Sequence, residues 1–137
     1  MARRKLSHEG TLVLDSEGLS RFVGDRESVV AKVAEARKRG MEVVISALTI
    51  IEATHNGTNR TRLGWALSGM RVVQVTEEDA KAASALLLDA GLHGHKYAID
   101  AVVAEMALRR QRPVVLLTSD SDDMTKLCGG RVRIVPL

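Results

Sequence analysis

The chain has 137 residues, of which 45% are hydrophobic, and a formal net charge of +3. This length suits one ordinary domain with its own core, and a single cysteine, Cys128, excludes an intrachain disulfide and a metal cage built from thiolates. Residues 1–10 are basic and polar without a following apolar stretch, and the most apolar run, 43–51, is too short to span a bilayer. We therefore expect a cytoplasmic protein without a signal peptide and without a membrane partner.

Short apolar runs alternate along the chain with segments of helical spacing. Residues 28–39 place Val29, Val33 and Ala36 on one helical face, and Gly40 ends the pattern. By the same criteria, helices are predicted at residues 28–39, 46–55, 60–68, 77–90, 97–110 and 121–127. Strands are predicted at residues 11–15, 42–45, 71–75, 114–118 and 131–135.

The order of these elements indicates the fold class. Because the predicted strands are apolar on both faces and are separated by helices, they indicate a parallel sheet that is covered on both sides. The expected class is α/β, as a three-layer α/β/α sandwich around a central parallel sheet of about five strands. Residues 11–137 are expected to form this single domain, preceded by residues 1–10 as a basic leader.

Four acidic residues lie where such a fold would bring them to one edge of the sheet. Asp15 ends the first predicted strand, Asp120 follows the fourth, and Glu52 lies in the helix after the second. Asp100 lies near the start of the helix before the fourth strand, beside apolar residues, where an unpaired carboxylate is costly. Ligands of parallel sheets bind at the carboxyl ends of the strands, so these acids are expected to converge there.

Converging carboxylates repel one another, and a divalent cation between them removes that repulsion. Oxygen ligands alone favour Mg²⁺ or Mn²⁺ over zinc. Such a site activates water for phosphodiester cleavage, so the acids are candidate catalytic and metal-binding residues, and Thr118 is expected to fix one carboxylate by a hydrogen bond. Each acid also has a purely structural explanation, such as a helix cap or a turn, and this alternative stays open for each residue taken singly.

Basic residues gather in clusters at residues 3–5, 37–39, 60–62 and 109–112. A basic surface around an acidic pocket suits an RNA substrate whose backbone is held by cations. Solvated helix ends also explain each cluster, because lysine and arginine favour the negative end of the helix dipole. The charge distribution is therefore compatible with RNA but does not identify the substrate-binding residues.

The order of the acidic motifs resembles the PIN-domain family, and in particular the VapC-like toxins of type II toxin–antitoxin systems. The resemblance covers residues 11–135 and rests on four motifs: LVLDS around Asp15, SALTIIEA around Glu52, YAIDAVVAEMA around Asp100, and TSDSDDM from Thr118. The last of these motifs is the most specific, and Asp15 taken alone is the least specific.

This resemblance implies an endoribonuclease that depends on Mg²⁺ or Mn²⁺, forms a homodimer and is inhibited by an antitoxin whose tail occupies the acidic groove. The family's metal ligands correspond to Asp15, Glu52, Asp100 and Asp120, and Asp123 matches a position that is often acidic in the family. Ser16 matches the first of two small hydroxyl residues that commonly follow the first aspartate. Glu17 stands in the place of the second hydroxyl.

Two other functions are compatible with an acidic pocket on a parallel sheet. A phosphoacceptor signalling domain is disfavoured because no acid follows the third predicted strand before Glu77. A PIN-like module that binds RNA or regulates without catalysis stays open, although all four expected acids are present. His93 and His95 are interpreted as loop residues, and His55, three residues after Glu52, as a minor candidate neighbour of the site.

Overall fold

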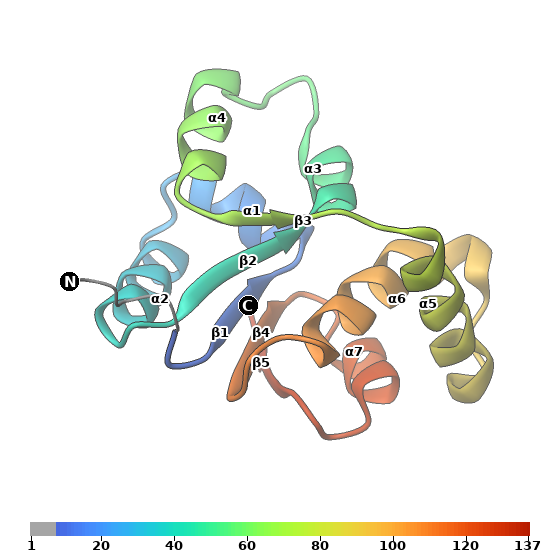
Figure 1. Cartoon of the computed structure of the whole chain (residues 1–137). Helices are drawn as coiled ribbons and strands as arrows, with labels where there is room; N and C mark the ends of the chain where they lie inside the picture. Colours follow the sequence, from blue (N-terminus) through green and yellow to red (C-terminus); the bar gives the residue numbers. More distant parts are fainter. Residues whose placement is uncertain (1–7) are drawn as a thin grey trace.

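The computed structural model describes residues 8–137, which fold around one parallel sheet (Figure 1). The strands are β1 (Thr11–Leu14), β2 (Glu42–Ser46), β3 (Arg71–Val73), β4 (Val114–Thr118) and β5 (Arg133–Pro136). They lie in the order β3-β2-β1-β4-β5, and each neighbouring pair is parallel. The predicted α/β class with a central parallel sheet of five strands is therefore confirmed.

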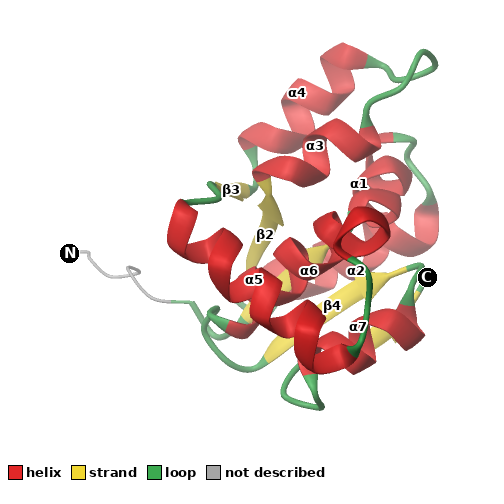
Figure 2. Cartoon of the chain, turned by 90° about the vertical axis from the view of Figure 1, so that its right-hand side faces the viewer, coloured by secondary structure: helices red, strands yellow, loops and turns green. Residues whose placement is uncertain are grey.

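Helices cover both faces of the sheet, as the three-layer prediction requires. They are α1 (Ser16–Val23), α2 (Glu27–Lys38), α3 (Ala47–Ala53), α4 (Arg60–Ser68), α5 (Glu77–Ala90), α6 (Gly94–Leu108) and α7 (Ser121–Cys128). Residues of α1, α2 and α4 pack in one core cluster, and residues of α5, α6 and α7 pack in another. Figure 2 looks onto the second layer, with the strands behind its helices.

The sheet separates the two cores, and successive residues of each strand point to opposite cores. Leu12 and Leu14 of β1 belong to the core on the side of α1 and α2, whereas Val13 belongs to the core on the side of α6 and α7. The same alternation sends Leu117 of β4 to the first core and Leu116 to the second. All five side chains are buried, because a parallel sheet covered on both faces leaves neither face in water.

One helix, α1, is absent from the elements predicted above. Its sequence contains Gly18 and two serines, which lower helix propensity and conceal an eight-residue helix. The helix forms because the Asp15 side chain caps its first turn, with Oδ1 accepting a hydrogen bond of 2.8 Å from the Gly18 amide. It also buries Leu19 and Phe22 against the sheet, and this tertiary packing outweighs the low propensity.

Two other differences concern the ends of elements. The helix predicted from residue 97 begins at Gly94, and Tyr97 marks a kink with non-helical torsions (φ −112°, ψ 17°). The strand predicted over residues 71–75 is limited to Arg71–Val73. Side-chain periodicity carries little information at such ends, where the backbone leaves regular geometry.

The predicted basic leader, residues 1–10, lies mostly outside the described residues. Its last part joins the fold through the Glu9 amide, which donates a hydrogen bond of 3.0 Å to the Gly40 carbonyl. Within residues 8–137, no helix is long and apolar enough to cross a membrane.

The entry of the chain into β1 gives a first prediction. Gly10 has a φ of +132°, and an added Cβ would lie 2.7 Å from the Pro113 carbonyl oxygen. We expect Gly10→Ala to lower the free energy of unfolding by about 1–3 kcal/mol, measured by urea denaturation. Gly64→Ala is the matched control, because nothing lies within 4 Å of its added Cβ inside α4. The control is expected to gain up to about 1 kcal/mol, and a Gly10→Ala protein as stable as wild type would contradict the prediction.

Candidate active site

Asp15 follows β1 and is the most buried of the predicted site acids, with 5% of its surface exposed. Its Oδ1 caps α1 through the Gly18 amide, and its Oδ2 accepts a hydrogen bond of 3.0 Å from the Ser119 amide. The second bond joins the end of β1 to the loop after β4, 104 residues further along the chain. Asp15 is therefore held rigidly at the carboxyl edge of the sheet.

Thr118 and Asp120 continue this edge from β4. Thr118 is fully buried, and its Oγ1 accepts a hydrogen bond of 2.9 Å from the Asp120 amide. The threonine thus orients the loop through the Asp120 backbone amide, whereas the predicted bond is one to a carboxylate. Asp120 occupies the N-cap position of α7, but its side chain makes no capping hydrogen bond. Its carboxylate is therefore not explained by helix capping.

The remaining predicted acids meet Asp120 at one pocket. This carboxylate pocket has a volume of about 510 Å³ and is lined by Glu52 from α3, Asp100 from α6, and Asp120 and Asp123 at the start of α7. Asp100 and Asp123 are half-buried, and Glu52 and Asp120 are exposed. Acids from three separate helices therefore line one pocket, and Asp15, which follows β1, is near enough for its charge to act on Asp100 and Asp120.

The acids of the pocket affect the pKa values of one another. Burial, followed by the charges of Asp120, Glu52, Asp123 and Asp15, raises the pKa of Asp100 from 3.8 to about 7. Burial and the charges of Asp15 and Asp123 also raise the pKa of Asp120. All five carboxyl groups therefore share one region of negative potential.

Two basic residues also line the carboxylate pocket, and the sequence analysis did not identify either as part of the site. They are His95 and Lys96, in the first turn of α6 before the kink at Tyr97. The positive charge of Lys96 acts on the pKa of Asp120 against the larger effects that raise it. The spacing of Lys96 four residues before Asp100 is a helical signal that could have revealed this proximity.

Ser16, the predicted supporting hydroxyl, lies just outside the carboxylate pocket. It is the first residue of α1 and lines an adjoining hollow together with Glu52 and Glu17. It is half-buried, and within the described residues its side chain makes no hydrogen bond to a neighbouring side chain. The structure therefore places Ser16 beside Glu52 rather than among the aspartates.

The chemistry of the pocket fits a hard divalent cation. Its acidic side chains offer only oxygen donors, and their mutual repulsion is the kind that a cation relieves. Within residues 8–137, however, no three acidic, histidine or cysteine side chains are already close enough to enclose an ion. Rotation of exposed side chains such as Glu52 is therefore needed to complete a coordination shell around the rigid Asp15.

The pattern of the PIN domain family matches residues 12–129, a span that contains all the acids of the site. The chain belongs to the PIN domain family. Among curated protein sequences, none matches the chain.

Three solved structures share this PIN domain fold. VapBC2 from Rickettsia felis, bound to a DNA fragment from its promoter, matches with a TM-score of 0.70 and 14% identity over 93% of this chain and 98% of that chain. A toxin–antitoxin complex from Klebsiella pneumoniae matches with a TM-score of 0.65 and 17% identity over 88% and 94%. FitAcB from Neisseria gonorrhoeae matches with a TM-score of 0.57 and 20% identity over 90% and 95%. At these identities the similarity establishes the fold alone.

The raised pKa of Asp100 gives a second prediction. The native state holds this proton more tightly than the unfolded chain, so its stabilising contribution is complete below pH 3.8 and is lost as the pH rises to about 7. Above that pH, the metal-free native state contains a carboxylate that its surroundings disfavour. At such a pH we expect Asp100→Asn to raise the free energy of unfolding by roughly 1–3 kcal/mol. This is less than the free energy that corresponds to the whole pKa shift, because the carboxyl group is partly solvated.

The measurement is urea unfolding in EDTA at a pH above about 7. Asp122→Asn serves as the control, since Asp122 is exposed in the same region and does not line the carboxylate pocket. An Asp100→Asn protein that is less stable than both wild type and this control would contradict the prediction.

Proposed function

We propose that this PIN domain is a metal-dependent endoribonuclease and the toxin of a type II toxin–antitoxin pair. The proposal rests on one observation: Glu52, Asp100 and Asp120, from distant parts of the chain, line a single pocket, and the charge of the neighbouring Asp15 helps to raise the pKa of Asp100. A cluster of carboxylates with oxygen donors alone suits phosphodiester hydrolysis better than nucleophilic catalysis by serine or cysteine. The lone cysteine, Cys128, is buried and lies outside this pocket.

The cofactor that we propose is Mg²⁺ or Mn²⁺. The residues that would hold it are Asp15, Glu52, Asp100 and Asp120, with Asp123 as a further ligand. When bound, the ion lowers the pKa of a water molecule and stabilises negative charge on the phosphodiester.

Asp15, Asp100 and Glu52 would have different roles in binding the ion and the water molecule. Asp15 provides a fixed position, because backbone amides hold both of its oxygens. Asp100 has a raised pKa of about 7 in the metal-free protein, so it would hold the ion as an anion only after giving up its proton. Glu52 is exposed and, within residues 8–137, forms no ion pair, so it is free to accept a hydrogen bond from the attacking water and orient it.

The proposed partners are an RNA substrate, a cognate antitoxin and a second copy of the chain in a homodimer, all in the cytoplasm. Support for an antitoxin comes from the Klebsiella pneumoniae neighbour, which is a toxin–antitoxin complex of the same fold. Support for RNA comes from the basic residues that border the carboxylates, which include Lys96 at the carboxylate pocket and Arg26 in the adjoining hollow that Glu52 also lines.

A catalytically inactive RNA-binding or regulatory PIN module is the second candidate. The observation in its favour is that no three potential ligands in the described part of the chain are preassembled around an ion. Metal binding and RNA cleavage therefore have to be tested separately.

Metal binding gives a third prediction. We expect millimolar Mn²⁺ to raise the melting temperature of the wild-type protein, because an ion that binds only the native state stabilises it by mass action. Asp100→Asn is expected to remove most of this rise, whereas Asp122→Asn keeps it. The measurement is differential scanning calorimetry with EDTA-treated samples as the reference. A melting temperature that Mn²⁺ leaves unchanged in wild type would count against a metal site.

RNA cleavage gives a fourth prediction and tests the function itself. With Mn²⁺, wild type is expected to cleave single-stranded RNA, and Asp15→Asn and Asp100→Asn to lose at least about a hundredfold in rate. Asparagine also caps helices well, so Asp15→Asn keeps the bond from the Gly18 amide that starts α1. Its side-chain nitrogen cannot accept the bond from the Ser119 amide, so this variant loses that tie to the loop after β4 together with the charge. Asp122→Asn is again the control and is expected to cleave normally. If wild type and both site variants are equally inert but bind RNA, the inactive module is correct.

A further inference from the structure

Two further hollows lie near the carboxylate pocket, around the end of α3. Glu52 lines the carboxylate pocket and also a neighbouring hollow of about 310 Å³, here called the arginine hollow. Ser20, Gly24 and His55 line the arginine hollow and also a third, more enclosed space of about 220 Å³, here called the His55 cavity. The shared residues place the three spaces next to one another, in the order carboxylate pocket, arginine hollow and His55 cavity, and this row of spaces is here called the path.

The arginine hollow offers one uncompensated cation. It is bordered by Arg21 and Arg26, and by the acids Glu17 and Glu52. Arg21 is paired with Glu17 at 2.9 Å, so these two charges compensate each other. Arg26, at the start of α2, is exposed and forms no ion pair within residues 8–137. Its guanidinium is therefore available to an anionic group that lies in the hollow.

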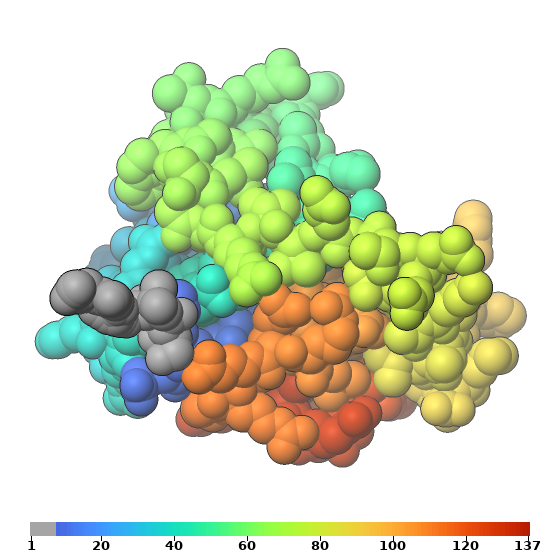
Figure 3. All heavy atoms as spheres, in the orientation of Figure 1, coloured from blue at the N-terminus to red at the C-terminus, as the bar shows by residue number. Residues whose placement is uncertain are grey.

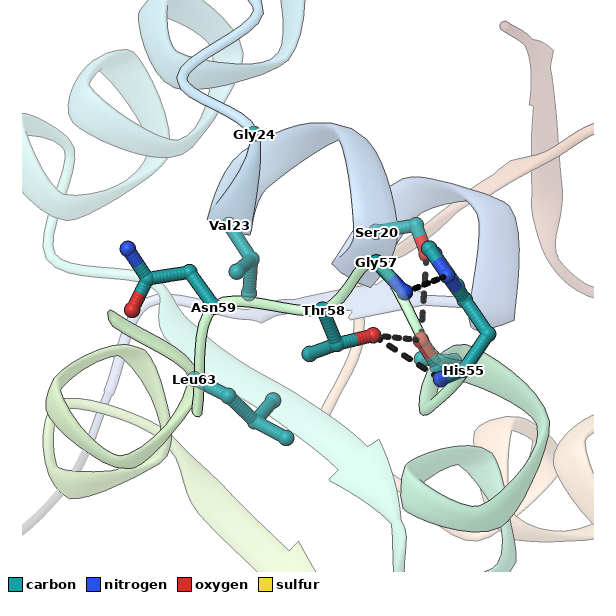
Figure 4. Close-up of a pocket in the computed structure, with 9 residues that line it drawn as sticks. Ser20, Val23, Gly24, His55, Gly57, Thr58, Asn59 and Leu63 are labelled. Atoms are coloured by element: carbon teal, nitrogen blue, oxygen red, sulfur yellow. Dashed lines mark hydrogen bonds between the residues drawn. The ribbon is translucent and has the colours of Figure 1, made fainter. Parts of the chain in front are cut away.

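The His55 cavity has apolar walls and a polar rim. Val23 of α1, Ala53 at the end of α3 and Leu63 of α4 supply the apolar surface, and Thr58 and Asn59 supply polar groups (Figure 4). The helix that carries Leu63 projects as a lobe at the top of the space-filling view (Figure 3). At about 220 Å³ the cavity is smaller than the ~300–1,000 Å³ typical of drug-sized ligands, so it suits a compact planar ring system.

The loop around this cavity is held in place by its own hydrogen bonds. The His55 Nδ1 accepts a bond of 3.1 Å from the Gly57 amide, and the Thr58 Oγ1 accepts one of 2.9 Å from the His55 amide (Figure 4). A neutral histidine whose Nδ1 accepts in this way carries its hydrogen on Nε2. The imidazole therefore presents a fixed face and a free donor, which are the features that stack on a nucleobase and bond to its edge.

We propose that this path binds single-stranded RNA, with one backbone phosphate on Arg26 and one unstacked nucleobase in the His55 cavity. This inference rests on the proposed nuclease function, since it names the part of the substrate that lies beside the cleaved bond. The order of groups along the path matches a nucleotide chain: acids for the reaction, then a cation for a phosphate, then an enclosed ring-sized space. A side chain of a protein partner would use the apolar walls but would leave Arg26 without an anion.

The experiment is a nuclear magnetic resonance titration of the ¹⁵N-labelled full chain in EDTA. The probes are adenosine and uridine monophosphates, with ribose 5-phosphate as the probe that lacks a base. We expect the monophosphates to shift the amide signals of Gly57 and Thr58 in the cavity and of Arg26 in the hollow. Ribose 5-phosphate is expected to shift only the signal near Arg26.

Two variants separate the parts of the path. His55→Ala is expected to weaken binding of the monophosphates about tenfold and to leave ribose 5-phosphate unaffected, because it removes the stacking face. Arg26→Gln is expected to weaken all three probes, because it removes the phosphate partner. His93→Ala is the matched control, as His93 is exposed in the loop before α6 and lines none of the three spaces. Asn59→Ser provides a second cavity variant, which keeps a helix-capping residue before α4.

Two outcomes would overturn the inference. Monophosphates that leave Gly57 and Thr58 unshifted would show that the cavity takes no base, which would leave a protein side chain as its occupant. Equal effects of His55→Ala on the monophosphates and on ribose 5-phosphate would show that the histidine acts only on the fold. The titration contains no divalent ion, so its outcome does not depend on catalysis. Failure of the wild-type protein to cleave RNA would contradict the proposed nuclease function but would leave the binding results of the titration unchanged.

Discussion

Both oxygens of the Asp15 carboxylate accept backbone hydrogen bonds, and the geometry of the whole site depends on this pair of bonds. One bond begins α1, and the other fastens the loop that carries Asp120 to the end of β1. The structural and functional explanations for Asp15 are therefore compatible with each other. A carboxylate has enough lone pairs to cap a helix, tie a loop and still contribute an oxygen to a cation. The aspartate is rigid because the fold uses it, and a rigid ligand is what a site with mobile acids needs.

The other acids are held less firmly, and their arrangement costs stability in the metal-free protein. Asp120 stands where an N-cap would stand and makes no capping bond, and Asp100 has a pKa raised to about 7. A sequence selected for stability alone would not place a carboxyl group among four others on a half-buried surface. Residues that are unfavourable for stability concentrate at functional sites. The gain in stability expected for Asp100→Asn measures how unfavourable this carboxyl group is.

The sequence was sufficient for the sheet and for the set of acids, because both follow from strong local patterns. Buried parallel strands are continuous apolar runs, and strand ends carry the acids to one edge regardless of the details of the helices. Helix α1 was not predicted, because a capping hydrogen bond and the burial of Phe22 stabilise it rather than the helix propensity of its residues. Lys96 and the His55 cavity were also not predicted, for a related reason. Their positions depend on a kink at Tyr97 and on hydrogen bonds within a loop, and neither leaves a periodic trace in the sequence.

The end of α3 lies between the carboxylate pocket and the His55 cavity. Glu52 lines the carboxylate pocket, while the carbonyl of the next residue, Ala53, accepts hydrogen bonds of 3.4 Å from both Ser20 and Thr58 at the His55 cavity. A group bound in the cavity would therefore lie against the same turn of α3 that carries Glu52, the acid proposed to orient water. This gives the loop after α3 a means to affect cleavage without containing a catalytic residue. In the proposed ribonuclease the acids would suit any phosphodiester, so any discrimination among RNA sequences would have to arise along the path beside them, where the His55 cavity is the most enclosed space.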